Sequence, residues 1–380
     1  MPIDLELNES EEMLRNTALD FLRRDTPKIV IQHLLDTDTG TNDDLWKTAA
    51  DMGWLGIVIP EEYGGSGLPL TSSGVLFEVL GSGPLPGPYF SSAILGTLVV
   101  LHAGSEAQKQ QLLPALARGD EVLALALTEA DYGWDPASIR TTASTVDGGF
   151  VLEGTKSFTV DAGAASKLIV VARTERTADP AGGISLFVID SDAQGLSVTR
   201  QPGFLAGRNF EIKLEGVRVP GSALLGTQNA GWTPLARAIT EATPVLCAYK
   251  AGASQAVIEM TLEYSRIREQ FGQAIGRFQR VQDMIIDQVT HTDAARWAAY
   301  EALWKLDTGQ PAAESVHLAK ALGSQGYWEV VTLGHQVFSG VGYSMESPIS
   351  FHTRTSRSLH HYLGEPSYHR QQLARILTTA

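Results

Sequence analysis

The segment HHYLGEPSYHR, residues 360 to 370, is the first candidate for an active-site segment in this sequence. It holds three of the nine histidines of the chain, together with tyrosine and a carboxylate, Glu365. Imidazole and carboxylate groups can transfer protons or hold a metal ion. Adjacent His360 and His361 cannot both face one metal ion from a helix, so we expect structural or surface positions for them and predict no metal site. The open question is whether Glu365 serves as a base.

A second candidate is the segment YSRIREQFGQAIGRFQ, residues 264 to 279. Helical spacing relates four of its side chains: Arg268, Phe271, Ile275 and Gln279. Gly272 and Gly276 weaken such a helix but would let a flat ligand or another chain approach closely. The segment could therefore bind a cofactor. The alternative is a helix start packed on a neighbouring element, with Arg268 in solvent.

A third candidate is HQVFSGVGYSMESP, residues 335 to 348, which predicts a helix ending in a glycine-rich turn. Backbone N–H groups of such a turn can bind an anion. The runs YGGSGLPL and GSGPLPG do not lead from a strand into a helix, as a dinucleotide-binding turn must, so we expect loops there.

The elements that position these candidates change character twice along the chain. Residues 1–120 carry helical periodicity, with Asn8 or Ser10 and Asn42 or Asp43 as N-cap candidates. Residues 121–226 contain six or more β-rich runs between Gly/Asp turns. Residues 227–380 return to helices, one of them more than about 25 residues long. The order predicts a multi-domain α+β protein.

Composition narrows the class of protein. The net charge of −14 and the single cysteine, Cys247, argue against nucleic acid, an anionic membrane and internal disulfides. The N-terminus lacks the order of a signal peptide, and no apolar run approaches the length of a membrane span. We therefore expect a cytoplasmic protein with no membrane and no nucleic acid as partner.

Five motifs in the same order resemble the acyl-CoA dehydrogenase family over nearly the whole chain. GSEAQKQQLLPALARGD resembles the stretch before the β domain of that family, ALTEADYGWDPASIRTTA resembles TEPGAGSD, and LEGTKSFTVDAG resembles GTKxWITNA. REQFGQAIGRFQ resembles RxxFGxxIxxFQ, and QVFSGVGYSMESP resembles QxxGGxGYxxEYP. The resemblance implies an N-terminal helical domain, a middle β-barrel-like domain and a C-terminal four-helix-bundle domain, together with FAD and a dimer or tetramer.

The chemistry implied by the resemblance needs a carboxylate base, a flavin and hydrogen bonds to a thioester. The base removes the α-proton of an acyl-CoA, and FAD takes the β-hydrogen as hydride. One subunit surrounds the flavin ring, and its neighbour holds the pyrophosphate and adenosine of the cofactor.

The residues that would bind the pyrophosphate and adenosine of FAD in a neighbouring subunit match the family closely. These expected cofactor-binding residues are Arg268, Phe271, Ile275, Gln279, Gln336, Ser339 and Gly340, where only Ser339 departs, replacing a glycine. Arg268 beside a pyrophosphate would make a charge-assisted contact.

The ring-side half departs further. Thr128 matches the family motif. Phe158 replaces a tryptophan, and its ring can still stack on the flavin. Val160 replaces a threonine and so lacks the hydroxyl that would hydrogen-bond the flavin. Trp134 replaces the serine of GSD and is expected to obstruct the place of the thioester.

The position of the base is the largest departure. Leu363 stands where many members keep it, and Ala242 stands at the position used by a subset. Glu241 is one residue from the second position, a rotation of about 100° on a helix. Three alternatives stay open at this point: Glu241 as base, Glu365 as base, or no base in this chain.

The asymmetry between the halves favours a subunit of a heteromeric α₂β₂ acyl-CoA dehydrogenase, with a homologous catalytic partner, acyl-CoA as substrate and an electron-transfer flavoprotein as acceptor. The alternatives are a homomeric enzyme that uses Glu241, a flavin-free scaffold, and a flavin oxygenase of the same fold.

Overall fold

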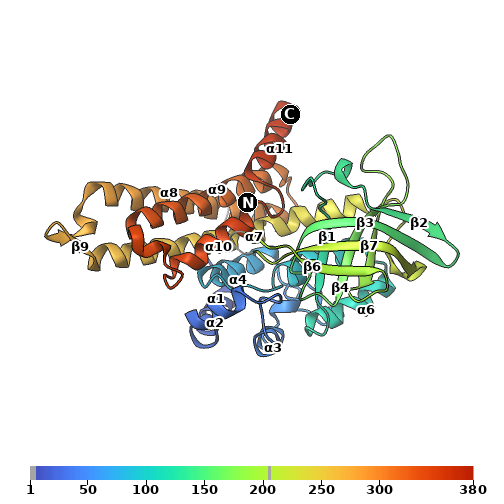
Figure 1. Cartoon of the computed structure of the whole chain (residues 1–380), viewed down its shortest axis with the longest axis horizontal. Helices are drawn as coiled ribbons and strands as arrows, with labels where there is room; N and C mark the ends of the chain where they lie inside the picture. Colours follow the sequence, from blue (N-terminus) through green and yellow to red (C-terminus); the bar gives the residue numbers. More distant parts are fainter. Residues whose placement is uncertain (1–5, 204–206, 380) are drawn as a thin grey trace. The chain divides into compact units, whose positions relative to one another are not determined.

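The computed structural model describes residues 6–203 and 207–379, and the chain forms two compact units (Figure 1). The helical unit comprises Met1–His33, Pro69–Leu85 and Thr243–Ala380. The sheet unit comprises Leu34–Leu68 and Pro86–Ala242. The domain boundaries at residues 120 and 226 remain a prediction, whereas the predicted order of helical, β and helical segments is confirmed.

The helical unit is built on three long helices, α7, α8 and α9. Its helices are α1 (Glu9–Asp25), α4 (Leu70–Ser82), α8 (Gln279–Asp307), α9 (Ala313–Phe338), α10 (Ile349–His360) and α11 (Pro366–Thr379), with most of α7 (Trp232–Ile267) and of α2 (Lys28–Leu35). Alanines on α8 and α9 pack around Cys247 of α7, and small side chains allow such helices to approach closely. The expected long helix is α8, which has 29 residues.

Two helix starts confirm the expected caps. The side chain of Asn8 accepts a hydrogen bond from the backbone N–H of Glu11, which closes a capping box. The side chain of Asn42 accepts from Leu45 N at the start of α3, and Gly53 follows that helix with φ of 75°. In each case the structure selects one of the two N-cap candidates that the sequence offered.

Among its described residues, the sheet unit has an eight-stranded sheet and short helices. The strands are β1 (Leu123–Ala126), β2 (Thr142–Val146), β3 (Gly149–Val160), β4 (Lys167–Arg173), β5 (Ile184–Asp190), β6 (Leu196–Arg200), β7 (Asn209–Pro220) and β8 (Leu224–Leu225). The order is β6-β7-β3-β2-β4-β5-β8, with β1 parallel to β4. The helices are α3 (Asp43–Asp51), α5 (Thr97–Ala103) and α6 (Glu106–Ala117). All six expected β-rich runs form strands.

Strand β1 was not expected from the sequence. Its residues are LALA, all buried, and a short apolar run cannot be assigned to helix or strand by periodicity. It is a strand because its four residues pair with β4.

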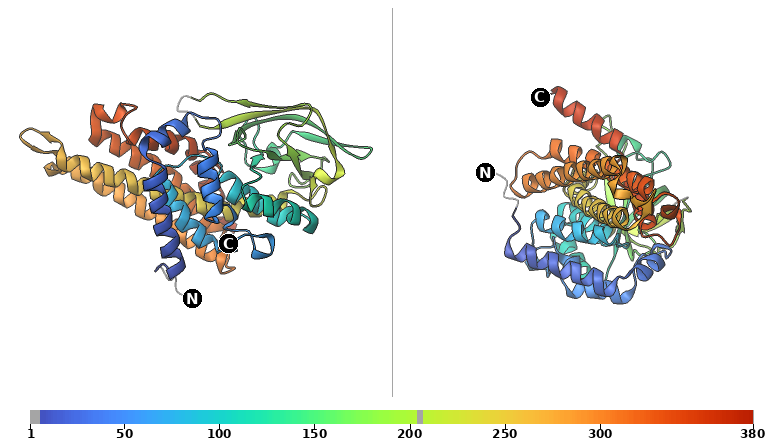
Figure 2. Two further views of the ribbon diagram at one scale, coloured as in Figure 1. Left: turned by 90° about the horizontal axis from the view of Figure 1, so that it is seen from below. Right: turned by 90° about the vertical axis from the view of Figure 1, so that its left-hand side faces the viewer.

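The helical spacing expected across residues 264–279 is wrong. Helix α7 ends at Ile267, and a hairpin of β9 (Glu269–Gln270) and β10 (Gln273–Ala274) precedes α8. Phe271 and Gly272 form its turn with φ of 54° and 78°, values that a right-handed helix excludes. The hairpin lies at the tip of the α7–α8 pair (Figures 1 and 2).

Within the described residues, no helix is long and apolar enough to span a membrane.

Candidate functional site

The residues of the REQFGQAIGRFQ motif lie at and beside the hairpin of the helical unit. The backbone N–H of Ile275 donates to the carbonyl of Arg268 at 2.9 Å and so closes the hairpin. The side chain of Phe271 is 93% exposed, and Arg268 and Gln279 are exposed as well. The left-handed backbone at Phe271 is costly for a residue with a Cβ, and it holds the ring in solvent.

The two motif glycines differ in surroundings. A Cβ added at Gly272 would meet no atom within 4 Å, whereas one at Gly276 would lie 3.0 Å from the carbonyl oxygen of Ser265. Gly276 therefore allows the chain to pack on its own helix α7, and Gly272 alone leaves open space.

The glycine-rich turn after α9 is attached to the same region. The rings of Tyr264 on α7 and Phe338 at the end of α9 stack with centroids 4.5 Å apart and planes 12° apart. This contact joins the segments that carry Arg268 and Ser339, so two motifs far apart in sequence meet in space.

Ser339, in the turn after α9, has the backbone conformation of a glycine. Ser339 has φ of 56° and ψ of −141°, a region that glycine adopts freely and other residues avoid. Gln336, Ser339 and Gly340 are exposed, and a Cβ at Gly340 would meet no atom within 4 Å. The expected site residues on this unit are therefore all accessible to a ligand, except that Ile275 is partly buried.

The ring-side residues lie in the sheet unit, where they form an aromatic cluster. Tyr132 contacts Trp134 edge-on at 5.8 Å and Phe158 edge-on at 5.0 Å between centroids. Tyr132 and Phe158 have φ of 54° and 59°, so two strained residues bring the rings together. Burial raises the pKa of Tyr132, which keeps its hydroxyl neutral.

Tyr132 is the residue that the sequence reasoning missed. The signal was present, because Tyr132 replaces a small residue of TEPGAGSD just as Trp134 does. Both side chains are larger than the alanine and serine that the family motif has at these positions.

Thr128 was expected to bind the cofactor, but its groups are used within the chain. Its hydroxyl donates to the carbonyl of Ser157 at 2.6 Å, and its own carbonyl accepts from Ser157 N at 2.9 Å. The side chain is buried. Thr128 therefore positions the strand that carries Phe158.

Two further motif residues, Glu129 and Lys156, form a buried ion pair. Lys156 Nζ lies 2.8 Å from Glu129 Oε1, which also accepts from the backbone and hydroxyl of Thr141. Burial lowers the pKa of Lys156 to about 8, although Glu129 opposes this. The pair holds the TEADYG loop to β3, which is a structural task.

Glu241 is held by two partners within the sheet unit. Its carboxylate accepts from His102 Nε2 at 2.5 Å and from Arg237 Nε at 2.9 Å. Burial would raise the pKa of Glu241, but the hydrogen bonds from His102 and Arg237 outweigh it and lower the pKa below its usual value. A carboxylate paired in this way is a weak base. Ala242 is fully buried beside it.

Leu363 and Glu365 lie in the turn before α11 of the helical unit. Leu363 is 1% exposed with φ of 60°, and its carbonyl accepts from His369 Nε2 at 2.8 Å. Glu365 is exposed and accepts a hydrogen bond from Ser367. The turn thus places an apolar side chain inward and its carboxylate in solvent.

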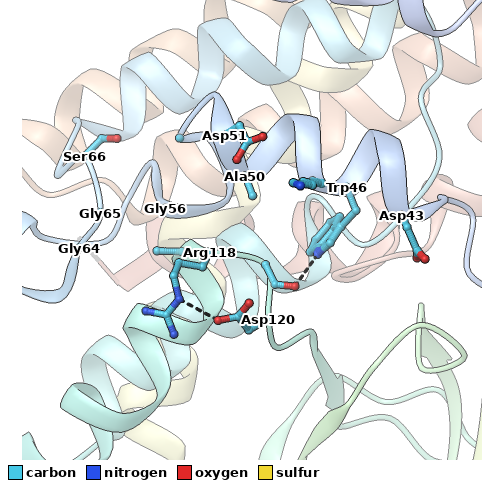
Figure 3. Close-up of a pocket in the computed structure, with 14 residues that line it drawn as sticks. Asp43, Trp46, Ala50, Asp51, Gly56, Gly64, Gly65, Ser66, Arg118 and Asp120 are labelled. Carbon is cyan, nitrogen blue, oxygen red and sulfur yellow. Dashed lines mark hydrogen bonds and ion pairs between the residues drawn. The ribbon is translucent and has the colours of Figure 1, made fainter.

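The sheet unit has a cavity of about 670 Å³ (Figure 3). Two polar side chains of its lining are held in place: Arg118 Nε lies 2.8 Å from Asp120, and Trp46 Nε1 donates to the carbonyl of Gly119. A Cβ at Gly119 would lie 2.9 Å from Trp46 Nε1, so this glycine serves packing. None of the expected site residues lines this cavity.

Comparison with known proteins identifies the class. Family profiles match in three consecutive parts: Acyl-CoA dehydrogenase, N-terminal domain at residues 8–120, middle domain at 124–214 and C-terminal domain at 229–378. The chain belongs to the acyl-CoA dehydrogenase family, whose members are FAD-dependent oxidoreductases.

Particular relatives are distant. The 3-(aryl)acrylate reductase of Clostridium sporogenes is 28% identical over 97% of this chain and 98% of its own length. The probable acyl-CoA dehydrogenase FadE25 of Mycobacterium tuberculosis is 30% identical over 86% of this chain and 85% of its own length. A solved FAD complex of PigA is 27% identical, covers 99% of each chain and has a TM-score of 0.92.

The described residues fit FAD on one side only. The exposed Arg268, Phe271 and Gly340 suit a pyrophosphate and a flat nucleotide, because they offer a cation, a ring and open space. On the ring side, Thr128 is buried and the cluster around Tyr132 fills the motif. The expected division of the FAD site between the two halves stays a prediction.

Proposed function

We propose that this chain is a subunit of a heteromeric, FAD-dependent acyl-CoA dehydrogenase. It contributes the adenosine and pyrophosphate side of the flavin site to a homologous catalytic partner in the cytoplasm. The substrate is an acyl-CoA thioester, and an electron-transfer flavoprotein is the acceptor. Bound FAD supplies hydride transfer, and this chain supplies binding groups rather than the base.

The observation that carries the proposal is the exposed ring of Phe271. It stands at a strained turn beside the exposed Arg268, as a group meant for another molecule would. A chain that had simply lost its function would have no reason to retain this costly arrangement.

The state of the possible bases supports the same proposal. Glu241 is held by His102 and Arg237, Leu363 carries no charge, and Glu365 faces solvent. Aromatic rings occupy the motif beside which a thioester would lie. The chain therefore needs a partner that contributes the base and the acyl pocket.

The decisive experiment compares the chain expressed alone with the chain co-expressed with a family member that retains a carboxylate at the position of Leu363. We expect flavin absorbance near ~450 nm and dye-coupled dehydrogenation only in the co-purified complex. Because one relative is an arylacrylate reductase, enoyl-CoA reduction is assayed alongside. Full flavin occupancy and turnover by the lone chain would overturn the proposal.

Matched variants locate the contribution of this chain. Arg268→Gln should lower the flavin content of the complex by about ten-fold, since a charge-assisted contact to phosphate is lost. Arg266→Gln, at the neighbouring exposed arginine of α7, should leave the flavin content unchanged. Equal losses in both variants would indicate a general effect of charge.

The homomeric alternative makes a different prediction for Glu241. If the lone chain turns over and Glu241→Gln abolishes that turnover, Glu241 is the base. A co-purified complex without flavin absorbance would instead support the flavin-free scaffold.

A further inference from the structure

A second cavity, of about 460 Å³, lies wholly within the helical unit. Helices α1, α4, α7 and α8 form its walls. Its volume falls in the range of small-molecule pockets. None of the residues expected to bind FAD or to act as base lines it, so it is not part of the site described above.

One wall of this cavity is aromatic. Trp297, Tyr300 and Trp304 line it from α8 at spacings of three and four residues, which places them on one helix face. The side chain of Trp297 is 50% exposed. Such a row is a surface on which an apolar or cationic group can lie.

The floor of the cavity is a fixed polar network. Glu78 of α4 accepts from Arg296 Nε at 2.8 Å and from the hydroxyl of Tyr300 at 2.6 Å. Arg296 Nη2 donates to Gln255 Oε1, and Gln255 Nε2 donates to Glu259 Oε1, both at 3.2 Å. Because burial and Glu78 raise the pKa of Tyr300, its hydroxyl stays a donor. The network gives the pocket a defined shape and neutralises the Arg296 charge.

The charge that remains is negative. Four glutamates and two arginines line the cavity, a formal charge of −4 + 2 = −2. The carboxylate of Glu259 is exposed and receives a hydrogen bond only from the neutral Gln255 among the described residues. An aromatic wall and an excess of carboxylates attract a cation and repel an acid.

We propose that this cavity binds an organic cation, an ammonium group carried on an apolar body. The cationic head lies against Trp297 and near Glu259, and the body fills the space above Tyr300 and Trp304. This site is separate from the proposed flavin site and does not depend on flavin or partner.

Binding is tested with the purified full-length chain by calorimetry and tryptophan fluorescence. The probes are benzyltrimethylammonium, and choline against its neutral isostere 3,3-dimethylbutan-1-ol. We expect saturable binding of benzyltrimethylammonium below about 1 mM. Choline should bind at least about ten-fold more tightly than the neutral alcohol, because only the charge differs.

Two variants assign the site. Trp297→Leu should weaken binding about three- to five-fold, which is the contribution of one cation–π contact at a partly exposed ring. Glu259→Gln should weaken it as well, whereas Glu263→Gln, one turn further along α7 and outside the cavity, should not. Unchanged thermal unfolding confirms that each variant is folded.

Three outcomes would overturn the inference. They are absence of saturable binding of benzyltrimethylammonium, equal binding of choline and the neutral alcohol, and equal weakening by Glu259→Gln and Glu263→Gln.

Discussion

His102 Nε2 lies 2.5 Å from Glu241 Oε2, although 139 residues separate the two in sequence. The two side chains are mostly buried, with 16% and 14% of their surfaces exposed. Arg237, one helical turn before Glu241, completes the group at 2.9 Å. The carboxylate nearest to a family base position is thus held by two nitrogen donors within its own unit.

Replacing this carboxylate should cost stability rather than activity. Glu241→Gln removes a partly buried charge from His102 and Arg237, so we expect a loss of about 1–3 kcal/mol in the free energy of unfolding at neutral pH. Chemical denaturation of the lone chain measures it. Dehydrogenase activity of a co-expressed complex should be unchanged per folded complex.

The same variant has a defined pH dependence. The pKa of Glu241 is lower in the folded chain than its usual value of 4.5, so the stabilisation is present above that value. It is lost as the pH falls further, through the folded pKa. The stability gap between wild type and Glu241→Gln should therefore narrow in acid, and a gap that widens would contradict the pairing.

The exposed ring of Phe271 makes an opposite prediction. Because the side chain is 93% exposed, Phe271→Ala should change the free energy of unfolding of the lone chain by less than about 0.5 kcal/mol. Flavin content of the co-expressed complex should fall, since the ring contributes to a surface made for another molecule. Absorbance of the purified complex measures this.

Phe338→Ala serves as the control for that experiment. Phe338 is buried and stacks on Tyr264, so its truncation should cost about 3 kcal/mol. A Phe271→Ala chain destabilised to the same degree would show that the ring is structural.

The sequence predicted those features that depend on local patterns. Asn8 and Asn42 cap their helices because capping is decided within three residues. The long apolar spacing of α8 and the alternation in the β runs follow from local periodicity as well. The five family motifs supplied the expected site residues.

What the sequence did not predict depends on backbone strain or on distance along the chain. The hairpin at Phe271 replaces a helix because two successive residues take positive φ, which residue spacing does not reveal. The capture of Glu241 by His102 joins elements far apart in sequence. The part played by Tyr132 became visible only when its ring was found between Trp134 and Phe158.

Replacing Ser339, in the turn after α9, with glycine should increase the stability of the chain. Ser339 adopts φ of 56° and ψ of −141°, a conformation that costs a residue with a Cβ about 1–3 kcal/mol. Glycine avoids this strain. It also gives the unfolded chain more conformational entropy, which lowers the free energy of unfolding by about 0.4–1 kcal/mol. Ser339→Gly should therefore stabilise the chain by about 1 kcal/mol in denaturant unfolding.

Ser344→Gly is the matched control for the relief of strain. Ser344 has φ of −67° and ψ of 137°, which any residue adopts, so glycine there should destabilise slightly. Stabilisation at both positions would show that strain at Ser339 is not the cause.

Two buried lysines in the helical unit give the last prediction. Lys250 and Lys320 are 1% and 0% exposed, and both donate to the hydroxyl of Ser324, at 2.7 and 2.9 Å. No carboxylate among the described residues pairs with either amine. Burial lowers the pKa of Lys250 to about 8 and lowers that of Lys320 well below its usual value.

The sign of the pH effect follows from this shift. Between pH 8 and 10.5 the unfolded chain keeps the Lys250 proton that the folded chain has released, so stability rises with pH in this window. Below pH 8 the penalty is complete and amounts to about 3 kcal/mol. Lys250→Met should therefore be more stable than wild type at pH 7, with a gap that closes toward pH 10.5 in denaturant titrations. Ser324→Ala, which removes only the shared hydroxyl, should instead destabilise at pH 7, and a pH-independent gap for Lys250→Met would mean that packing rather than charge sets the difference.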